Sequence, residues 1–328
     1  GWLIWTRSTP PPAPEFQLSE AFEPISAVLS EVVYSPDGKD LYGSDWSGSI
    51  HKWNCRTRKK ETLYTDLDKS ARYLCMCKDQ KGEHLIFAGM FCPVRCLNVT
   101  SGTVTRELPP QGHRTWGLAL SPDEKLLAVG GEAGIVLYDW RTGKQVRTLR
   151  TRFEYIWTLA FSPDGKYLAV AGKNNQTFQT VVLFNVQTGE PSCWFKDHHR
   201  DARSIDFHPT EPLIVSGGFD GWIHIRNYLT GEEAAKCLAI RDGYVERVVF
   251  LADGKHVLFG GGSPDGKTVE QAGMAIWNFT NGKEVARWQT EELVGLVCMR
   301  ASPNGRWIVT GGKREGVRLW KMPPLLAK

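Results

Sequence analysis

The chain has 328 residues with 13 Trp, 14 Phe and 33 Gly, which supplies enough apolar area for a core and suits a fold with many turns. Its net charge of +4, from 40 Lys and Arg against 36 Asp and Glu, gives no argument for binding to nucleic acid. The sequence contains no run of about 18 apolar residues and therefore predicts no membrane-spanning helix.

The N-terminal residues 1–15 include Pro10, Pro11, Pro12 and Pro14, and this stretch predicts an extended lead-in outside any sheet. A short apolar run follows at residues 16–22 and predicts a strand that precedes the first complete unit. At the other end, residues 324–328 form a short tail.

The clearest structural unit runs from Tyr155 to Phe195. Four apolar runs are joined there by the turn Ser162–Gly165, a polar loop and the turn at Thr188–Gly189. Proline and glycine stand where they would break a helix, and β-branched and aromatic residues fill the runs between them. This pattern predicts a four-stranded antiparallel sheet.

The unit recurs along the chain. Turns related to Ser162–Gly165 begin at residues 35, 79, 121, 162, 208, 251 and 302, and the second turn recurs in phase at residues 101, 142, 188, 230 and 281. A period of this length predicts an all-β, seven-bladed β-propeller of four-stranded antiparallel blades over residues 16–323. The last unit supplies only three strands, so we expect the strand at residues 16–22 to complete that blade and close the ring.

Several third strands end in an aromatic residue followed by Asp or Asn, or in a related pair, and one Gly-His pair precedes a unit. These motifs are Lys52-Trp53-Asn54, Tyr138-Asp139, Ile276-Trp277-Asn278, Leu319-Trp320, Gly112-His113 and Asp220-Gly221. Together with the turns they make residues 16–323 resemble the WD-repeat β-propeller family. The resemblance implies a scaffold that binds other proteins. The copies depart from the family pattern, because most lack the His–Ser–Trp–Asp network that staples a typical blade.

Aligned first strands place the residue five positions before each turn at the mouth of the central channel. In chain order these residues are Ser30, Leu74, Trp116, Trp157, Arg203, Glu246 and Val297. Trp, Tyr and Arg around one opening are typical of a protein-binding hot spot. The predicted partner-binding residues are therefore Arg114, Trp116, Tyr155, Trp157, Arg203, Tyr244 and Glu246. The alternative is that the Trp side chains only fill the channel.

The loops between strands vary more on that face than the short turns of the opposite face. Two are long, at residues 173–179 and 263–271, and they are either tolerated insertions or further partner contacts. The second overlaps a phosphate-loop pattern at residues 261–268, but we expect a strand to follow it, so no phosphate site is predicted.

Two groups of metal-binding residue types also occur. Cys75, Cys77, Cys92 and Cys96 lack the paired C-x-x-C spacing of a zinc site, so core thiols are the favoured interpretation. The polar stretch 196–201 contains His198 and His199 without a third ligand at a fixed spacing, which favours a solvated loop.

The sequence as a whole favours a non-catalytic scaffold that binds a protein or peptide on the loop face around the channel. The expected molecule is a monomeric, cytoplasmic propeller without a cofactor or metal, since scattered cysteines fit a reducing compartment. The alternative hypothesis is a propeller enzyme, a hydrolase or lyase, that acts at the channel mouth with His198 or His199 and Glu246.

Overall fold

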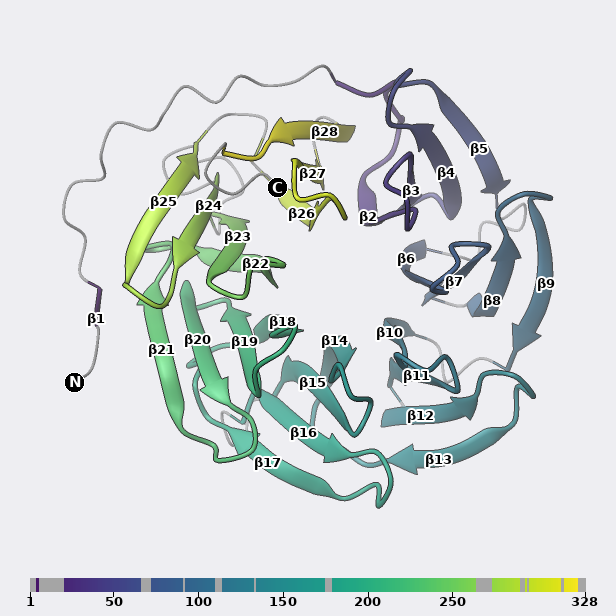
Figure 1. Cartoon of the computed structure of the whole chain (residues 1–328). Coiled ribbons are helices and arrows are strands. Elements are labelled where there is room, and N and C mark those ends of the chain that lie inside the picture. Colours follow the sequence, from purple (N-terminus) through teal and green to yellow (C-terminus); the bar gives the residue numbers. More distant parts are fainter. Residues whose placement is uncertain are drawn as a thin grey trace.

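The computed structural model describes residues 4–5, 21–65, 72–90, 92–109, 114–132, 134–174, 179–263, 273–289, 293, 295–313 and 316–323. Seven antiparallel sheets stand side by side in a ring and form the blades of a propeller (Figure 1). This confirms the predicted all-β, seven-bladed fold. Within the described ranges no helix is long and apolar enough to cross a membrane.

Each blade is a meander of consecutive strands, numbered in chain order. Blade 1 contains β2 (Leu29–Tyr34), β3 (Asp40–Asp45), β4 (Ser49–Asn54) and β5 (Lys60–Thr65). Blade 2 contains β6 (Arg72–Lys78), β7 (His84–Met90), β8 (Cys92–Asn98) and β9 (Thr103–Leu108). Blade 3 contains β10 (Thr115–Leu120), β11 (Leu126–Gly131), β12 (Gly134–Asp139) and β13 (Gln145–Leu149). Blade 4 contains β14 (Tyr155–Phe161), β15 (Tyr167–Lys173), β16 (Val181–Asn185) and β17 (Pro191–Phe195).

The remaining blades follow the same order around the ring. Blade 5 contains β18 (Ala202–Phe207), β19 (Leu213–Gly218), β20 (Trp222–Asn227) and β21 (Glu233–Leu238). Blade 6 contains β22 (Tyr244–Phe250), β23 (His256–Gly262), β24 (Gly273–Asn278) and β25 (Lys283–Trp288). Blade 7 contains β26 (Leu296–Ala301), β27 (Trp307–Gly312) and β28 (Gly316–Lys321).

The recurring first turn is held by its own side chains. In blade 4 the Ser162 hydroxyl donates to the Asp164 carboxylate at 2.6 Å and accepts the Tyr167 N–H at 3.0 Å, while Gly165 takes a positive φ of 70°. Turns of neighbouring blades also touch, because a Cβ atom on Gly82 would lie 2.4 Å from Pro36. The turns therefore form a uniform ring on one face of the disc.

The core is divided among the junctions between blades. In the described part of the chain, buried apolar side chains form one cluster between each pair of neighbouring blades, and the last of these joins blade 7 to blade 1. A single blade buries too little area to be stable alone, so this packing fixes the blades relative to one another.

The seam of the ring lies between blades 7 and 1. Most of the strand predicted there, residues 16–20, lies outside the described residues. Phe22, which follows, is buried in the seam cluster and donates its backbone N–H to the Val317 carbonyl of β28 at 3.4 Å. Further upstream, Ile4–Trp5 form β1, which pairs in parallel with β21, whereas the sequence predicted no strand in that segment.

Blade 5 carries a buried polar network. His198 is 1% exposed, and its two ring nitrogens lie 2.9 Å from the Ser216 hydroxyl and 3.0 Å from the Asp220 carboxylate. The prediction of a solvated loop at residues 196–201 was therefore wrong for His198. It is also wrong for Asp197, whose carboxylate accepts hydrogen bonds from the Arg226 guanidinium at 2.7 and 2.8 Å.

Candidate functional site

Outside blade 2, whose first-strand side chains are not described at this position, a β-bulge in the first strand aims one side chain at the channel mouth. The pairing register of β14 with β15 passes from Ile156 directly to Thr158, so Trp157 has no partner across the sheet. The same break skips the corresponding residue in five other first strands, namely Ser30, Trp116, Arg203, Glu246 and Val297. In β6 the register passes from Arg72 to Cys75, so Leu74 is skipped together with Tyr73. A β-bulge turns its extra residue out of the sheet. Because the bulge recurs at the same position in these blades, the bulged residues come together around the channel.

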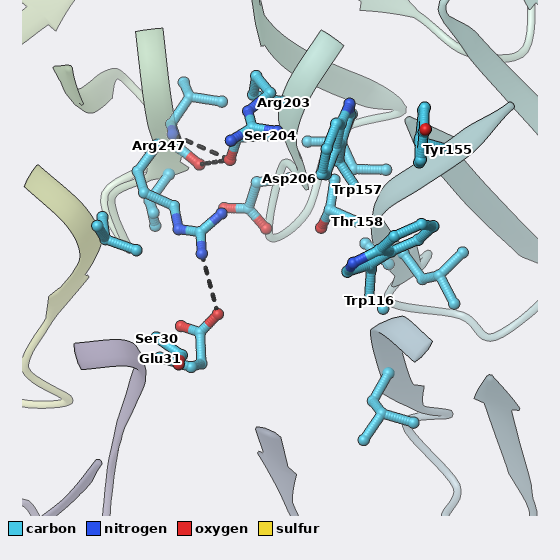
Figure 2. A pocket seen from close by; sticks show the side chains of 18 of the residues that line it. Ser30, Glu31, Trp116, Tyr155, Trp157, Thr158, Arg203, Ser204, Asp206 and Arg247 are labelled. Carbon is cyan, nitrogen blue, oxygen red and sulfur yellow. Dashed lines mark hydrogen bonds and ion pairs between the residues drawn. The ribbon is translucent and has the colours of Figure 1, made fainter. Parts of the chain in front are cut away.

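Three aromatic side chains from blades 3 and 4 form the centre of the site. Trp116 lies 5.8 Å from Trp157 and 5.1 Å from Tyr155 between ring centroids, and Tyr155 stacks on Trp157 at 5.6 Å with 16° between the ring planes. All three are half-buried. Figure 2 shows them as one group on one side of the cavity that occupies the channel.

Trp157 is fixed from two directions. The Arg203 guanidinium lies over its ring, 4.0 Å from the centroid, and its indole N–H donates to Asp201 at 3.2 Å. Arg203 in turn donates to both oxygens of Glu246, the shorter contact being 3.2 Å. Glu246 is 8% exposed and therefore acts within the site as the anchor of Arg203.

The contacts continue into blade 6. Arg203 also lies over Phe219, at 4.9 Å, and Phe219 stacks on Tyr244 at 4.8 Å. Burial raises the pKa of Tyr244, and the neighbouring Glu246 carboxylate adds to the effect, so the phenol keeps its proton and can donate a hydrogen bond. At the other end, Arg114 lies 5.9 Å from the Trp116 ring centroid and pairs with Glu132 at 3.5 Å.

The structure thus brings all seven predicted side chains into one connected group. We call this group the rim surface: Arg114, Trp116, Tyr155, Trp157, Arg203, Tyr244 and Glu246. Sequence reasoning missed Phe219, Asp201 and Glu132, which come from loops after other strands. No repeated position marked them, because these loops differ from blade to blade.

The residues of the other sequence hypotheses lie elsewhere. Cys92 and Cys96 are buried free thiols, and nothing is described of the side chains of Cys75 and Cys77. The long loops are described only in part, since residues 175–178 and 264–272 lie outside the described ranges. The enzyme hypothesis paired His198 or His199 with Glu246. Both ring nitrogens of His198 contact blade 5 side chains, His199 is exposed, and Glu246 binds Arg203.

Besides Asp79, Glu83 and His84 of blade 2, one further described cluster has the ligand types of a metal site, namely Asp197, His224 and Glu233. Its carboxylates already have cationic partners, because Arg226 binds Asp197 and Lys236 binds Glu233 at 3.0 Å. Burial and the charge of His198 lower the pKa of His224 to about 4. The donor set is therefore compensated by protein cations, and it gives no argument for a metal ion.

The ring and its bulged inner strands define a seven-bladed β-propeller of antiparallel blades. A family model described as "WD domain, G-beta repeat" matches residues 143–177, 189–227 and 290–321, so WD40 repeats are present in three places. This confirms the resemblance to WD-repeat propellers that the turns and third strands indicated.

Comparison with solved structures supports the same fold. A chain in the crystal structure of the mitotic checkpoint complex superimposes with a TM-score of 0.78, and the match covers 98% of both chains at 18% sequence identity. A likeness at this identity shows the fold alone. A search of curated proteins gives no significant match.

Proposed function

We propose that this propeller is a non-catalytic scaffold that binds a segment of a partner protein on the rim surface. The observation that carries the proposal is the unbroken series of contacts from Arg114 through Trp116, Trp157 and Arg203 to Tyr244. Rigid aromatic side chains with an anchored arginine are the usual composition of a binding hot spot. The proposal includes a monomeric ring in the cytoplasm.

Three cationic side chains of this propeller limit which partner side chains can bind the rim surface. Arg114 lies over Trp116, Lys173 over Tyr155 at 5.7 Å, and Arg203 over Trp157. A cationic partner side chain would meet like charge at each ring, which disfavours it. The segment that fits best therefore offers apolar or acidic side chains to this surface.

Two variants test the rim surface. Trp157→Ala removes the central ring, and the double change Arg203→Gln with Glu246→Gln removes the ion pair without leaving one buried charge alone. We expect each variant to weaken partner capture about tenfold or more, as truncation of a hot-spot residue does. The measurement is capture of the partner by immobilised propeller, with melting temperatures recorded in parallel.

Lys166→Ala provides the matched control. Lys166 lies in the turn ring on the opposite face, with its side chain 74% exposed, and we expect this variant to capture the partner as the wild type does. Undiminished capture by well-folded rim variants would exclude the rim surface as the binding site.

A further inference from the structure

The cavity in the central channel opens directly at the rim surface. It has a volume of about 910 Å³, and its lining includes five residues of the rim surface, namely Arg114, Trp116, Tyr155, Trp157 and Arg203. Figure 2 shows the three aromatic rings on one side of this cavity. A cavity of roughly 300–1,000 Å³ can enclose a small molecule, and it can equally enclose one side chain of a bound polypeptide. A partner segment on the rim surface therefore lies over an open pocket.

Apolar side chains with exposed area continue below the rim surface. Val249 of β22, Val297 of β26 and Ala160 of β14 line the cavity, and all three are half-buried. Val297 is the bulged residue of its strand and has no partner across the sheet. Removal of apolar area from water is favourable, so an apolar side chain that enters the cavity gains free energy at this wall.

The charged groups of the cavity wall balance one another. The two arginines of the rim surface are each paired with a glutamate. Deeper in the channel, Glu31 contacts both Arg247 at 3.2 Å and Arg300 at 3.1 Å. The fourth carboxyl group is Asp206, and burial raises its pKa to about 6, which leaves it ionised at neutral pH. Four arginines therefore face four carboxylates, and the wall has no net charge.

This balance disfavours a charged side chain of either sign. Such a side chain would lose its hydration in the cavity, and each charged group of the described lining already has a counter-charge. Burial of an unpaired charge is costly, and capture of a counter-ion from an existing pair would leave another charge alone. Of the apolar and acidic side chains that suit the rim surface, only an apolar one suits the cavity.

The aromatic wall favours a ring as the entering group. The ring plane of Trp116 is inclined by 47° to that of Trp157 and by 61° to that of Tyr155, so the three rings form a corner. A further ring can pack edge to face or offset against such a corner, as aromatic pairs prefer. Figure 2 shows the indole nitrogen of Trp116 on the side that faces the cavity, where it can donate to an acceptor on the entering segment.

We propose that the partner segment inserts one neutral aromatic side chain through the rim surface into the channel cavity. This anchor packs between the corner of Trp116 and Trp157 and the apolar wall at Val249 and Val297. The inference rests on the proposed function, because it assigns the anchor residue of the same partner segment. A single aromatic anchor in a desolvated pocket is the usual centre of a binding hot spot.

Four small probes with a common backbone test the chemistry of the cavity. They are the N-acetyl amides of phenylalanine, 4-carboxyphenylalanine, 4-aminomethylphenylalanine and leucine. Their binding to the whole chain is measured by ligand-observed NMR at neutral pH and at concentrations up to about 10 mM. We expect the phenylalanine probe to bind, both charged probes to bind about tenfold more weakly or less, and the leucine probe to bind several-fold more weakly.

Two variants locate the anchor. Val249→Phe and Val297→Phe each fill the cavity from its apolar wall. We expect each to weaken both partner capture and binding of the phenylalanine probe about tenfold or more, while the melting curve shows a folded protein. Val146→Phe is the matched control, since Val146 is 54% exposed on β13, and this variant should behave as the wild type does.

The outcomes separate this inference from the proposed function. Capture that is lost in Trp157→Ala but unchanged in both folded cavity variants would show that the rim surface binds the partner without an inserted side chain, which overturns the inference alone. Equal affinity for the neutral probe and either charged probe, a leucine probe that binds as tightly, or absence of phenylalanine-probe binding over the whole range would also overturn it. Undiminished capture by Trp157→Ala would overturn the proposed function and the inference together.

Discussion

Asp206 is the carboxyl group whose protonation the fold alters most clearly in the channel. Its pKa is raised to about 6 from an ordinary value of 3.8, chiefly because burial disfavours the charged form. The carboxyl nevertheless joins two blades, since it accepts the N–H of Phe250 across the junction from β18 to β22. The carboxyl group that titrates is therefore itself part of a hydrogen bond between blades 5 and 6.

The sign of the resulting pH dependence follows from linkage. Between about pH 4 and 6 the folded protein holds the Asp206 proton and the unfolded chain has released it, so this residue stabilises the fold less as the pH rises. We expect Asp206→Asn to remove this contribution, which is at most about 3 kcal/mol at roughly 1.4 kcal/mol per pKa unit. Urea unfolding of wild type and variant across this range gives the difference, in which the other carboxyl groups cancel. Parallel stability curves for the two proteins would contradict the assignment.

The rim residues could be predicted from the sequence because they repeat. Trp116, Trp157 and Arg203 each stand five residues before a recognisable turn. The residues of the channel wall could not be predicted in the same way. Glu31 and Arg247 directly follow a bulged residue, and the bulge shifts the pairing register there, so simple alternation along the strand gives the wrong face.

At the scale of strands and blades, the turns explain why so much of the fold was predictable. Ser162, Asp164 and Gly165 form the turn with their own atoms, so the local sequence is sufficient to specify it. The His198 network was not predicted, because it joins residues 18 and 22 positions apart that meet only when blade 5 is folded. Strand order in each blade follows the chain, whereas such contacts depend on tertiary packing.

Substitution of Phe22 tests how strongly the stability of the seam between blades 7 and 1 depends on packing. Its ring is 4% exposed, lies 6.4 Å from Trp53 between centroids, and has the Arg58 guanidinium above it at 4.9 Å. We expect Phe22→Ala to lower the free energy of unfolding by about 3–5 kcal/mol, the usual cost of such a cavity, and Phe22→Leu to lower it less.

The matched control for the seam is Val146→Ala, because Val146 is 54% exposed on β13. Its stability should stay within about 0.5 kcal/mol of wild type in the same denaturant titration. A Phe22→Ala variant as stable as this control would show that the seam does not depend on Phe22.

At the scale of the whole molecule, the two faces of the disc differ. The face with the Ser-Pro-Asp-Gly turns is built from repeated contacts, such as Ser162 with Asp164, that are internal to each turn. The opposite face carries the rim surface, whose residues differ between blades and contact one another across them. A rigid ring with one variable face is suited to present a binding surface without a conformational change.

The central claim is that the partner binds the rim surface, and site-specific photo-crosslinking tests it most directly. A photoreactive residue is placed at Arg200, which is exposed and lies 5.7 Å from the Phe219 ring, or at Lys166 on the opposite face. We expect one polypeptide to crosslink from position 200 and not from position 166, and Trp157→Ala in the same chain to abolish that crosslink. Crosslinking of the partner from position 166, or a crosslink from position 200 that survives Trp157→Ala, would contradict the claim.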